Sequence, residues 1–228
     1  EAGSDAISPN RHTDINSNPE LLDMISRVRD VSDKPVGFKA VIGAYGWLDN
    51  LFSEIQERGV ESAPDFITVD SADGGTGAAP MPLIDKLNEY GLRDRVRVIA
   101  SGKLITPADV AWALCMGPDF IVSARGFMFA LGCIQALQCN RNTCPTGITT
   151  HNKRLQKGLN PADKAVRVAN YARNMNYEVG IIAHSCGVRE PRELCRFHAR
   201  VVTTNGLSVP LNELHPDVIP PGESSSAA

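Results

Sequence analysis

The sequence lacks a hydrophobic run long enough to span a membrane, and its first twelve residues, EAGSDAISPNRH, contain no apolar signal core. It also lacks an excess of charge of one sign, because 23 basic and 26 acidic residues give a net charge of −3 and a pI near 6.0. We therefore expect neither a membrane nor a nucleic acid as partner, since both attract strongly basic surfaces.

An initiator methionine is missing too, so we expect the chain to be part of a longer protein or to have been processed. Its 228 residues suffice for one substantial core or two small ones. Six cysteines could indicate disulfides, but disulfide scaffolds are short, whereas this chain is long and 43% hydrophobic. A reduced, cytoplasmic setting fits better, and there a tight group of cysteines is more often catalytic or metal-binding than structural.

Short, β-branched apolar runs alternate with helical patterns along most of the chain. The runs, typical of parallel strands covered on both faces, lie at 36–43, 65–71, 95–102 and 119–126, and the helical patterns lie at 48–59, 83–92 and 107–117. A helix should precede them, starting at Asn18-Pro19-Glu20. Two more should follow, one from Pro161 to about Ile182 and one after Pro191. Strand–helix alternation predicts an α/β fold built of βαβ units, either a (β/α)₈ barrel or an open doubly wound sheet.

Each predicted strand ends in small or polar residues, at the edge where both of these folds place their ligands. The first strand ends at Gly43, and the second runs into Asp73-Gly74-Gly75-Thr76-Gly77. Glycines there let the backbone approach a ligand closely, although a tight turn would explain them equally well. Ser101-Gly102-Lys103 and Ala124-Arg125-Gly126 end the third and fourth strands and suit a phosphate site, the alternative being solvated loop cations.

Lys39 lies inside the apolar run VGFKAVIG, where an unpaired buried ammonium would be costly. Strand alternation puts it on the same face as Gly37 and Val41. If that face points into a barrel, Lys39 reaches the catalytic centre, and an anionic ligand would supply its counter-charge. The alternative is a lysine that extends to solvent from a strand end.

Three cysteines, Cys133, Cys139 and Cys144, follow in the pattern C-x5-C-x4-C. Thiolates are soft ligands that suit iron–sulfur clusters or zinc. With His151 they could form a Cys₃His zinc site, although zinc sites usually use paired cysteine knuckles and no second knuckle is present. A four-iron cluster would need a fourth thiol, which could come from Cys115, Cys186 or Cys195; Cys115 lies in an apolar helical pattern typical of a packed side chain.

Three stretches together resemble the FMN-binding domain of glutamate synthase, and more closely its stand-alone relatives. They are VDSADGGTGAAP (69–80), ASGKLITPADV (100–110) and SARGFMFALGCIQALQCNRNTCPTGITTHN (123–152). The resemblance covers about Ile7 to Leu159.

The resemblance implies a role for each of these groups of residues. It makes Cys133, Cys139 and Cys144 the ligands of a [3Fe–4S] cluster. It places Lys39 near the pyrimidine edge of the flavin, and Asp73 and Thr76 beside the flavin and a 2-oxoacid. The residues implied to surround FMN are Lys39, Gly74, Gly75, Ser101, Gly102, Lys103, Ala124, Arg125 and Gly126.

The implied reaction is a glutamate-synthase-like oxidoreduction. Electrons would pass from a donor, such as ferredoxin or a reductase subunit, through the cluster to FMN. FMN would then reduce 2-iminoglutarate, formed from 2-oxoglutarate and ammonia, to L-glutamate. One alternative is a relative that acts on another imine or oxoacid, and another is a non-catalytic, zinc-stabilised fragment.

Only four strands are predicted, whereas a complete barrel has eight. The chain should therefore be the C-terminal half of the (β/α)₈ barrel, and a lone half would leave strand edges exposed. We expect another chain or segment to supply the first half. The expected division is residues 1–132 for the half barrel, 133–159 for the cluster loop, and 160–228 for a helical extension with a disordered tail.

Overall fold

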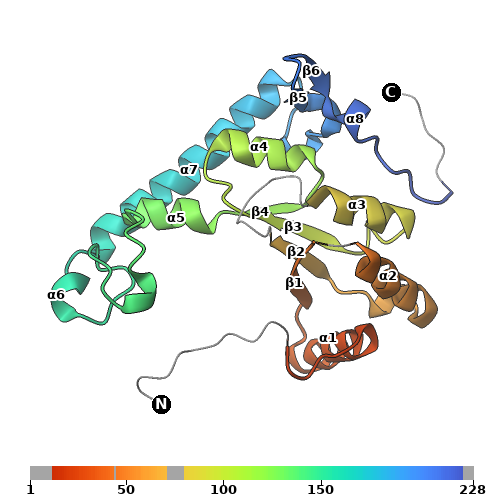
Figure 1. The fold of residues 1–228 in the computed structure, drawn as a ribbon, viewed down its shortest axis with the longest axis horizontal. Coiled ribbons are helices and arrows are strands. Elements are labelled where there is room, and N and C mark those ends of the chain that lie inside the picture. The colour runs from red at the N-terminus through yellow and green to blue at the C-terminus, as the bar shows by residue number, and fades with distance from the viewer. Residues whose placement is uncertain (1–11, 44, 71–79, 223–228) are drawn as a thin grey trace.

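The computed structural model describes residues 12–43, 45–70 and 80–222. Four parallel strands form its central sheet: β1 (Gly37–Val41), β2 (Phe66–Asp70), β3 (Arg97–Ser101) and β4 (Phe120–Val122). They lie side by side in chain order, so every connection moves on to the next strand in the same direction (Figure 1). A doubly wound sheet would reverse its strand order partway. The sheet is therefore consistent with part of a (β/α)₈ barrel.

Helices occupy the stretches between and before the strands. These are α1 (Asn18–Ser32), α2 (Gly46–Arg58), α3 (Pro80–Glu89) and α4 (Pro107–Cys115). Their starts follow the expected chemistry: Ser17 accepts a hydrogen bond from the Glu20 N–H before α1, and Thr106 and Asp109 form a capping box at α4. Local sequence thus marks where α1 and α4 begin, whereas α2 has no side-chain cap.

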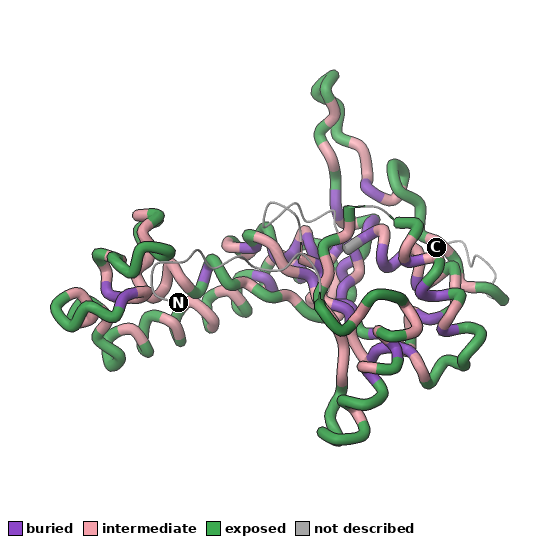
Figure 2. The backbone as a smooth tube through the Cα atoms, turned by 60° about the horizontal axis from the view of Figure 1, so that its bottom comes forward, coloured by how far each residue is buried: buried purple, intermediate pink, exposed green. Residues whose placement is uncertain are grey.

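The main core lies between the sheet and α2 and α3. Leu48, Leu51 and Phe52 of α2 are fully buried there, as are Ile67 and Val69, the alternate residues of β2. Figure 2 shows the buried residues gathered around the sheet, whereas the end that carries the cysteine segment is mostly half-buried or exposed. The sheet and the helices α2 and α3 therefore contain the main core of the described residues.

The opposite face of the sheet is much less covered by the described residues. Val41, Phe120 and Val122 point to that face and are each exposed to about half of their area. Parallel sheets are normally covered on both faces, so this apolar surface is unusual for a parallel sheet. It corresponds to the interior side of a barrel.

One aspartate fastens β2 to β1 at the amino ends of the strands. Asp65 accepts a hydrogen bond of 2.7 Å from the Val36 N–H, and its carboxylate also contacts Arg29 at 3.1 Å and Arg95 at 3.0 Å. Burial raises the pKa of Asp65, but the hydrogen bonds from Val36 and Arg29 outweigh burial and hold the pKa below its usual value near 3.8.

The same arrangement recurs at β4, because both strands begin with Phe-Ile and an aspartate directly precedes each of them. Asp119 accepts a 2.7 Å hydrogen bond from the Val98 N–H and contacts Arg93 at 2.9 Å and Arg97 at 3.1 Å. Each aspartate thus ties the start of its strand to its neighbour, at the end of the sheet opposite to the expected site.

The remaining elements extend away from the sheet. They are α5 (Ala124–Leu131), α6 (Lys153–Gln156), α7 (Pro161–Ser185), α8 (Leu211–Leu214), the hairpin β5 (Arg200–Val202) and β6 (Ser208–Pro210), and short 3₁₀ turns at Val60–Ser62, Cys139–Arg141, Pro191–Glu193 and Arg196–His198. The long helix α7 packs on both α4 and α5. No helix within the described ranges is long and apolar enough to cross a membrane.

Two element predictions were wrong. The run 119–126 is a strand only to Val122, because α5 begins at Ala124. The helix expected after Pro191 is a single 3₁₀ turn, Pro191–Glu193. The expected disordered tail falls mostly on residues 223–228, which lie outside the described residues.

Asp65→Asn should destabilise the protein by about 1–3 kcal/mol at neutral pH, since a partly buried charged acceptor is lost. The pKa of Asp65 is lower in the folded protein than in the unfolded chain. The stabilisation is therefore complete at pH values above the unfolded-state pKa near 3.8, and it is lost as the pH falls through the folded-state pKa of Asp65. Urea unfolding at pH 7 and near pH 3 measures the difference, which should shrink at the lower pH. The exposed Asp94→Asn is the control, and an equal loss in both variants would contradict the assignment.

Candidate functional site

A cleft of about 310 Å³ opens at the carboxyl ends of the four strands. Its lining residues are Lys39, Thr68, Asp70, Ser101, Gly102, Lys103, Val122, Ala124 and Arg125. Six of them were predicted from the sequence, so the structure brings together residues that lie up to 86 positions apart, from 39 to 125. The predicted residues Asp73, Gly74, Gly75 and Thr76 lie outside the described residues.

An ion pair crosses the floor of this cleft. The Lys39 ammonium lies 2.7 Å from the Asp70 carboxylate, which also accepts a 3.3 Å hydrogen bond from the Ser101 hydroxyl. The Lys39 side chain is 58% exposed. Lys39 thus lines the cleft with a side chain that reaches solvent, and Asp70 supplies a counter-charge in the described residues.

Sequence reasoning did not select Asp70. It ends the strand β2 just as Ser101 ends β3, and the two residues are register partners. The only signal in the sequence was an acidic residue at the end of an apolar run. Its pairing with Lys39 depends on the alignment of β1 with β2, which a single sequence does not display.

The backbone around Lys103 and Ala124 suits an anion. Gly102 and Lys103 both have positive φ values, 126° and 44°, which turn the chain sharply after β3. The next strand leads directly into α5, and the Ser123 hydroxyl donates to the Leu104 carbonyl instead of capping that helix. The first N–H groups of α5 therefore have no side-chain cap, and helix N-termini of this kind bind phosphate.

Charge reinforces this preference. Lys39, Lys103 and Arg125 line the cleft, whereas Asp70 is the one acidic residue among its described lining residues. Gly126 does not line the cleft, although it was predicted with Ala124 and Arg125. It lies behind them in the first turn of α5, where a side chain would strike Tyr171.

A second cavity of about 210 Å³ adjoins the cleft. Its lining residues are Arg125, Met128, Cys133, Ile134, Gln135, Ala136, Leu137, Gln138, Cys139, Cys144 and Thr146. We call it the cysteine cavity, because all three cysteines of the C-x5-C-x4-C pattern line it. Arg125 lines both cavities, so the cleft at the strand ends and the three thiols are neighbours.

Cys144 is the most acidic of the thiols for which a shift is resolved. A hydrogen bond with the Thr146 hydroxyl, 3.3 Å away, and another from the Thr149 backbone lower the pKa of Cys144 to about 6. A thiolate is the form that binds metal, so Cys144 is ready to act as a ligand at neutral pH.

The cysteine cavity fits a metal cluster by its donor set, but its thiols are not yet gathered into a ligand set. Across the described ranges, no three His, Cys, Asp or Glu side chains are close enough to hold a metal ion. His151 does not line the cysteine cavity; it lines a separate, open cavity of about 520 Å³ on the other side of Cys139. This placement disfavours a Cys₃His zinc site.

The remaining cysteines lie elsewhere. Cys115 is buried in α4. Its burial is the main cause that raises the pKa of its thiol to about 12, and the nearby thiols of Cys186 and Cys195 contribute to the same shift. It therefore remains a neutral, packed thiol at physiological pH, as its apolar helix suggested. None of these three lines the cysteine cavity, and the structure offers no fourth thiol there.

The model of the conserved region in glutamate synthase matches residues 1–189, which include the described parts of the cleft and the whole cysteine cavity. The chain belongs to the glutamate synthase family. The match ends soon after α7, before the β5–β6 hairpin.

Relatives agree with this membership. The chain is 39% identical over 229 residues to the glutamate synthase large subunit-like protein YerD of Bacillus subtilis, covering 94% of this chain and 43% of that protein. It is 32% identical to the archaeal glutamate synthase [NADPH] of Methanocaldococcus jannaschii, with 84% of this chain and 40% of that protein covered. It is 30% identical to the archaeal-type glutamate synthase [NADPH] of Thermotoga maritima, with 82% of this chain and 39% of that protein covered. The chain thus spans about two fifths of the length of these relatives.

In the metal-free protein, Cys144 should be alkylated by iodoacetamide much faster than Cys115 at pH 7. The rate at Cys144 should fall to half near pH 6 as its thiolate is protonated. Thr146→Val should shift that midpoint upward, because the hydroxyl that stabilises the thiolate is lost. Mass spectrometry of the labelled peptides measures both rates, with Cys115 as internal control. A midpoint near 8.5 in the unaltered protein would contradict the assignment.

Proposed function

We propose that the chain forms the FMN- and cluster-binding part of a glutamate-synthase-type oxidoreductase. The observation that carries this proposal is the adjacency of two sites: an anion-binding cleft at the strand ends and a cavity lined by three thiols, with Arg125 common to both. The reaction proposed is the reduction of 2-iminoglutarate, formed from 2-oxoglutarate and ammonia, to L-glutamate.

FMN suits the cleft because its phosphate matches the groups present. The turn at Gly102 and Lys103 and the N-terminus of α5 would hold the phosphate, and Arg125 would add charge. At the other side of the cleft, Lys39 would present a cation to the ring, held in place by Asp70. Bound FMN would supply hydride transfer, while Asp73 and Thr76 remain the proposed catalytic partners of Lys39.

The cysteine cavity would hold a [3Fe–4S] cluster, since three thiols match three irons. Such a cluster would supply single-electron transfer. The chain's own contribution is to keep Cys144 ionised through Thr146 and to place the three sulfurs on one short segment behind Arg125. Iron binding would require the cysteine side chains to turn further into the cavity.

We propose that a further segment or chain completes the barrel. The interior face of the sheet exposes Val41, Phe120 and Val122, and β1 and β4 are its two edge strands. Open edges and an uncovered apolar face both favour pairing with more strands. Completion would also enclose the cleft, because Lys39 lies on the same face.

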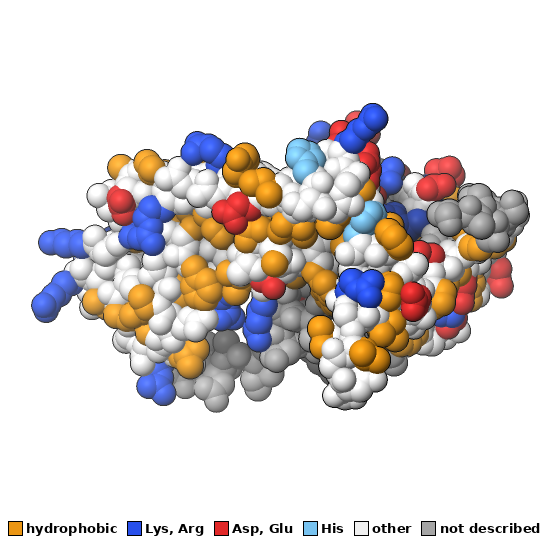
Figure 3. Space-filling model, turned by 90° about the horizontal axis from the view of Figure 1, so that it is seen from above, with side chains coloured by type: hydrophobic (Ala, Val, Ile, Leu, Met, Phe, Trp, Pro, Cys, Tyr) orange, Lys and Arg blue, Asp and Glu red, His pale blue; other side chains and the backbone are white. Residues whose placement is uncertain are grey.

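The electron donor is proposed to dock on the cysteine segment. Between Asp119 and Asp163 the chain has no acidic residue but five basic ones: Arg125, Arg141, Lys153, Arg154 and Lys157. This stretch therefore has a net charge of +5. The rest of the chain, with 18 basic and 26 acidic residues, has a net charge of −8. Figure 3 shows lysine and arginine side chains at the end of the molecule that carries α6. A donor with an acidic surface, such as a ferredoxin or a reductase subunit, would be attracted to this end.

The cofactor proposal predicts the content of anaerobically purified protein, produced together with the segment that completes the barrel. We expect bound flavin and about three irons per chain, measured by absorption spectroscopy and metal analysis. Cys139→Ser should abolish iron binding and leave flavin in place, whereas Cys186→Ser, outside the cysteine cavity, should change neither. Zinc in place of iron, or a protein without flavin, would contradict the proposal.

The docking proposal predicts a salt-dependent rate of electron transfer from an acidic donor. Replacing both Lys153 and Arg154 by glutamate should slow cluster reduction at low ionic strength by about tenfold or more and flatten its salt dependence, because exposed charges act mainly on association. Stopped-flow spectroscopy measures the rate. Lys34→Glu, exposed at the far end of the sheet, is the matched control, and equal effects of both changes would contradict the docking site.

A further inference from the structure

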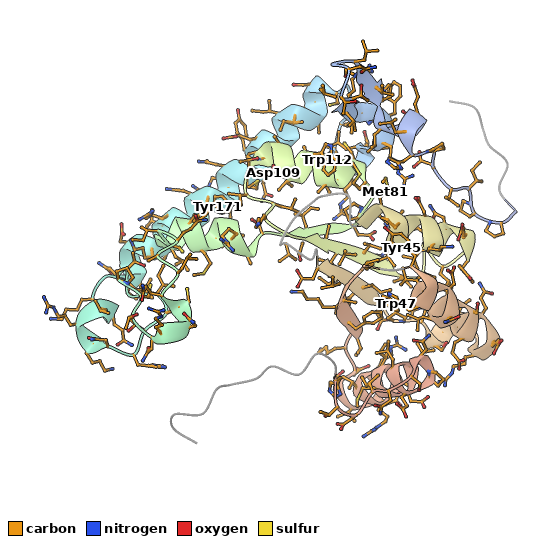
Figure 4. The ribbon with its side chains drawn as sticks, viewed as in Figure 1. Tyr45, Trp47, Met81, Asp109, Trp112 and Tyr171 are labelled. Carbon is orange, nitrogen blue, oxygen red and sulfur yellow. The ribbon has the colours of Figure 1, made fainter. Side chains whose placement is uncertain are left out.

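A tyrosine of the long helix α7 reaches the loops of the cleft. The Tyr171 hydroxyl donates a 2.8 Å hydrogen bond to the Ile105 carbonyl and lies 3.2 Å from the Ser123 hydroxyl oxygen. Ser123 in turn donates to the carbonyl of Leu104. Figure 4 labels Tyr171 on α7 at the point where this helix passes α5.

Each hydroxyl in this group has a single hydrogen to donate, and each of these hydrogens has one acceptor. Two hydroxyls carry two hydrogens, and two successive carbonyls, of Leu104 and Ile105, accept them. The turn after β3 is thereby tied to the residue that precedes α5. Ser123 makes this tie itself through its hydrogen bond to Leu104, and no hydrogen then remains between the two hydroxyl oxygens. Tyr171 fastens the carbonyl of Ile105, which lies 66 residues earlier in the chain.

Packing reinforces the hydrogen bonds. The ring of Tyr171 meets the ring of Phe127 edge to face, with centroids 5.1 Å apart and planes at 83°. A β-carbon at Gly126 would lie 1.8 Å from the Tyr171 hydroxyl oxygen, so the tyrosine would have to leave its present position. Gly126 therefore leaves the space that the tyrosine fills, and this explains a glycine in the first turn of α5 without a direct contact to the ligand.

We propose that Tyr171 is a positioning residue of the phosphate cleft. It fixes the distance between the turn at Gly102 and Lys103 and the N-terminus of α5, the two backbone segments that would share one phosphate. Its effect passes through the Ile105 carbonyl and through the packing of its ring on Phe127, so it touches neither ligand nor reacting atoms. The identity of the ligand rests on the proposed function, but the tie between the two segments does not.

Hydrogen exchange tests the tie without any ligand. In Tyr171→Phe, amides in residues 101–106 and 123–128 should exchange about tenfold faster, while those of β2 should keep the rate of the unaltered protein. Tyr177→Phe is the matched control, because Tyr177 is on the same helix and 69% exposed. Ser123→Ala should accelerate the same two segments, because it removes the second hydroxyl and leaves the ring contact with Phe127.

Ligand binding tests the consequence for the phosphate. In the protein produced with the barrel-completing segment, Tyr171→Phe should weaken FMN binding about tenfold and leave riboflavin, which lacks the phosphate, almost unaffected. Fluorescence titration with both flavins measures the ratio. A merely structural role would weaken both flavins alike. That result, unchanged exchange in the two segments, or exchange accelerated throughout the chain would each overturn the proposal.

The two proposals fail in different ways. If the unaltered protein binds no flavin, the proposed function is wrong, while hydrogen exchange still decides whether Tyr171 holds the two segments. If flavin binds and the ratio of FMN to riboflavin affinity stays constant in Tyr171→Phe, the function stands and the positioning role is wrong.

Discussion

Parallel pairing of four consecutive strands is the constraint on which the rest of this structure depends. It carries the end of every strand to the same edge of the sheet, so Lys39, Asp70, Ser101 and Val122 line one cleft although they are far apart in the chain. A shift of β1 by one residue would turn Lys39 toward the helices and remove it from the cleft. The chemistry of the site is thus a consequence of strand register.

Cleft and cysteine cavity form a single electrostatic unit. Arg125 lies where the two meet, and the segment that holds the thiols carries only basic charged residues. In the proposed function a cluster held by three thiolates would be negatively charged, as would a phosphate, so the same cation would stabilise both. The whole chain nevertheless has a net charge of only −3, and the total conceals the separation of charge along the sequence.

Much of this could be predicted from the sequence, because buried parallel strands are nearly continuous apolar runs and the three cysteines lie within twelve residues. The pairing of Lys39 with Asp70 could not be predicted, since it depends on the register between β1 and β2. The boundary between β4 and α5 was missed because FIVSARG contains neither a proline nor an acidic residue that would mark the first turn of a helix. Tyr171 could not be predicted for a different reason: its hydroxyl donates to a backbone carbonyl, that of Ile105, and a backbone acceptor leaves no trace in side-chain patterns.

The aspartates that precede β2 and β4 hold the sheet together from the end away from the cleft. The stabilising aspartates and the cleft therefore lie at opposite ends of the same strands. Loops at the carboxyl ends of the strands, around the cleft, can change in sequence or length without breaking the hydrogen bonds of Asp65 and Asp119 at the amino ends. Descendants of this frame could accordingly acquire new substrates through loop changes alone, and their divergence should be concentrated at one end of the sheet.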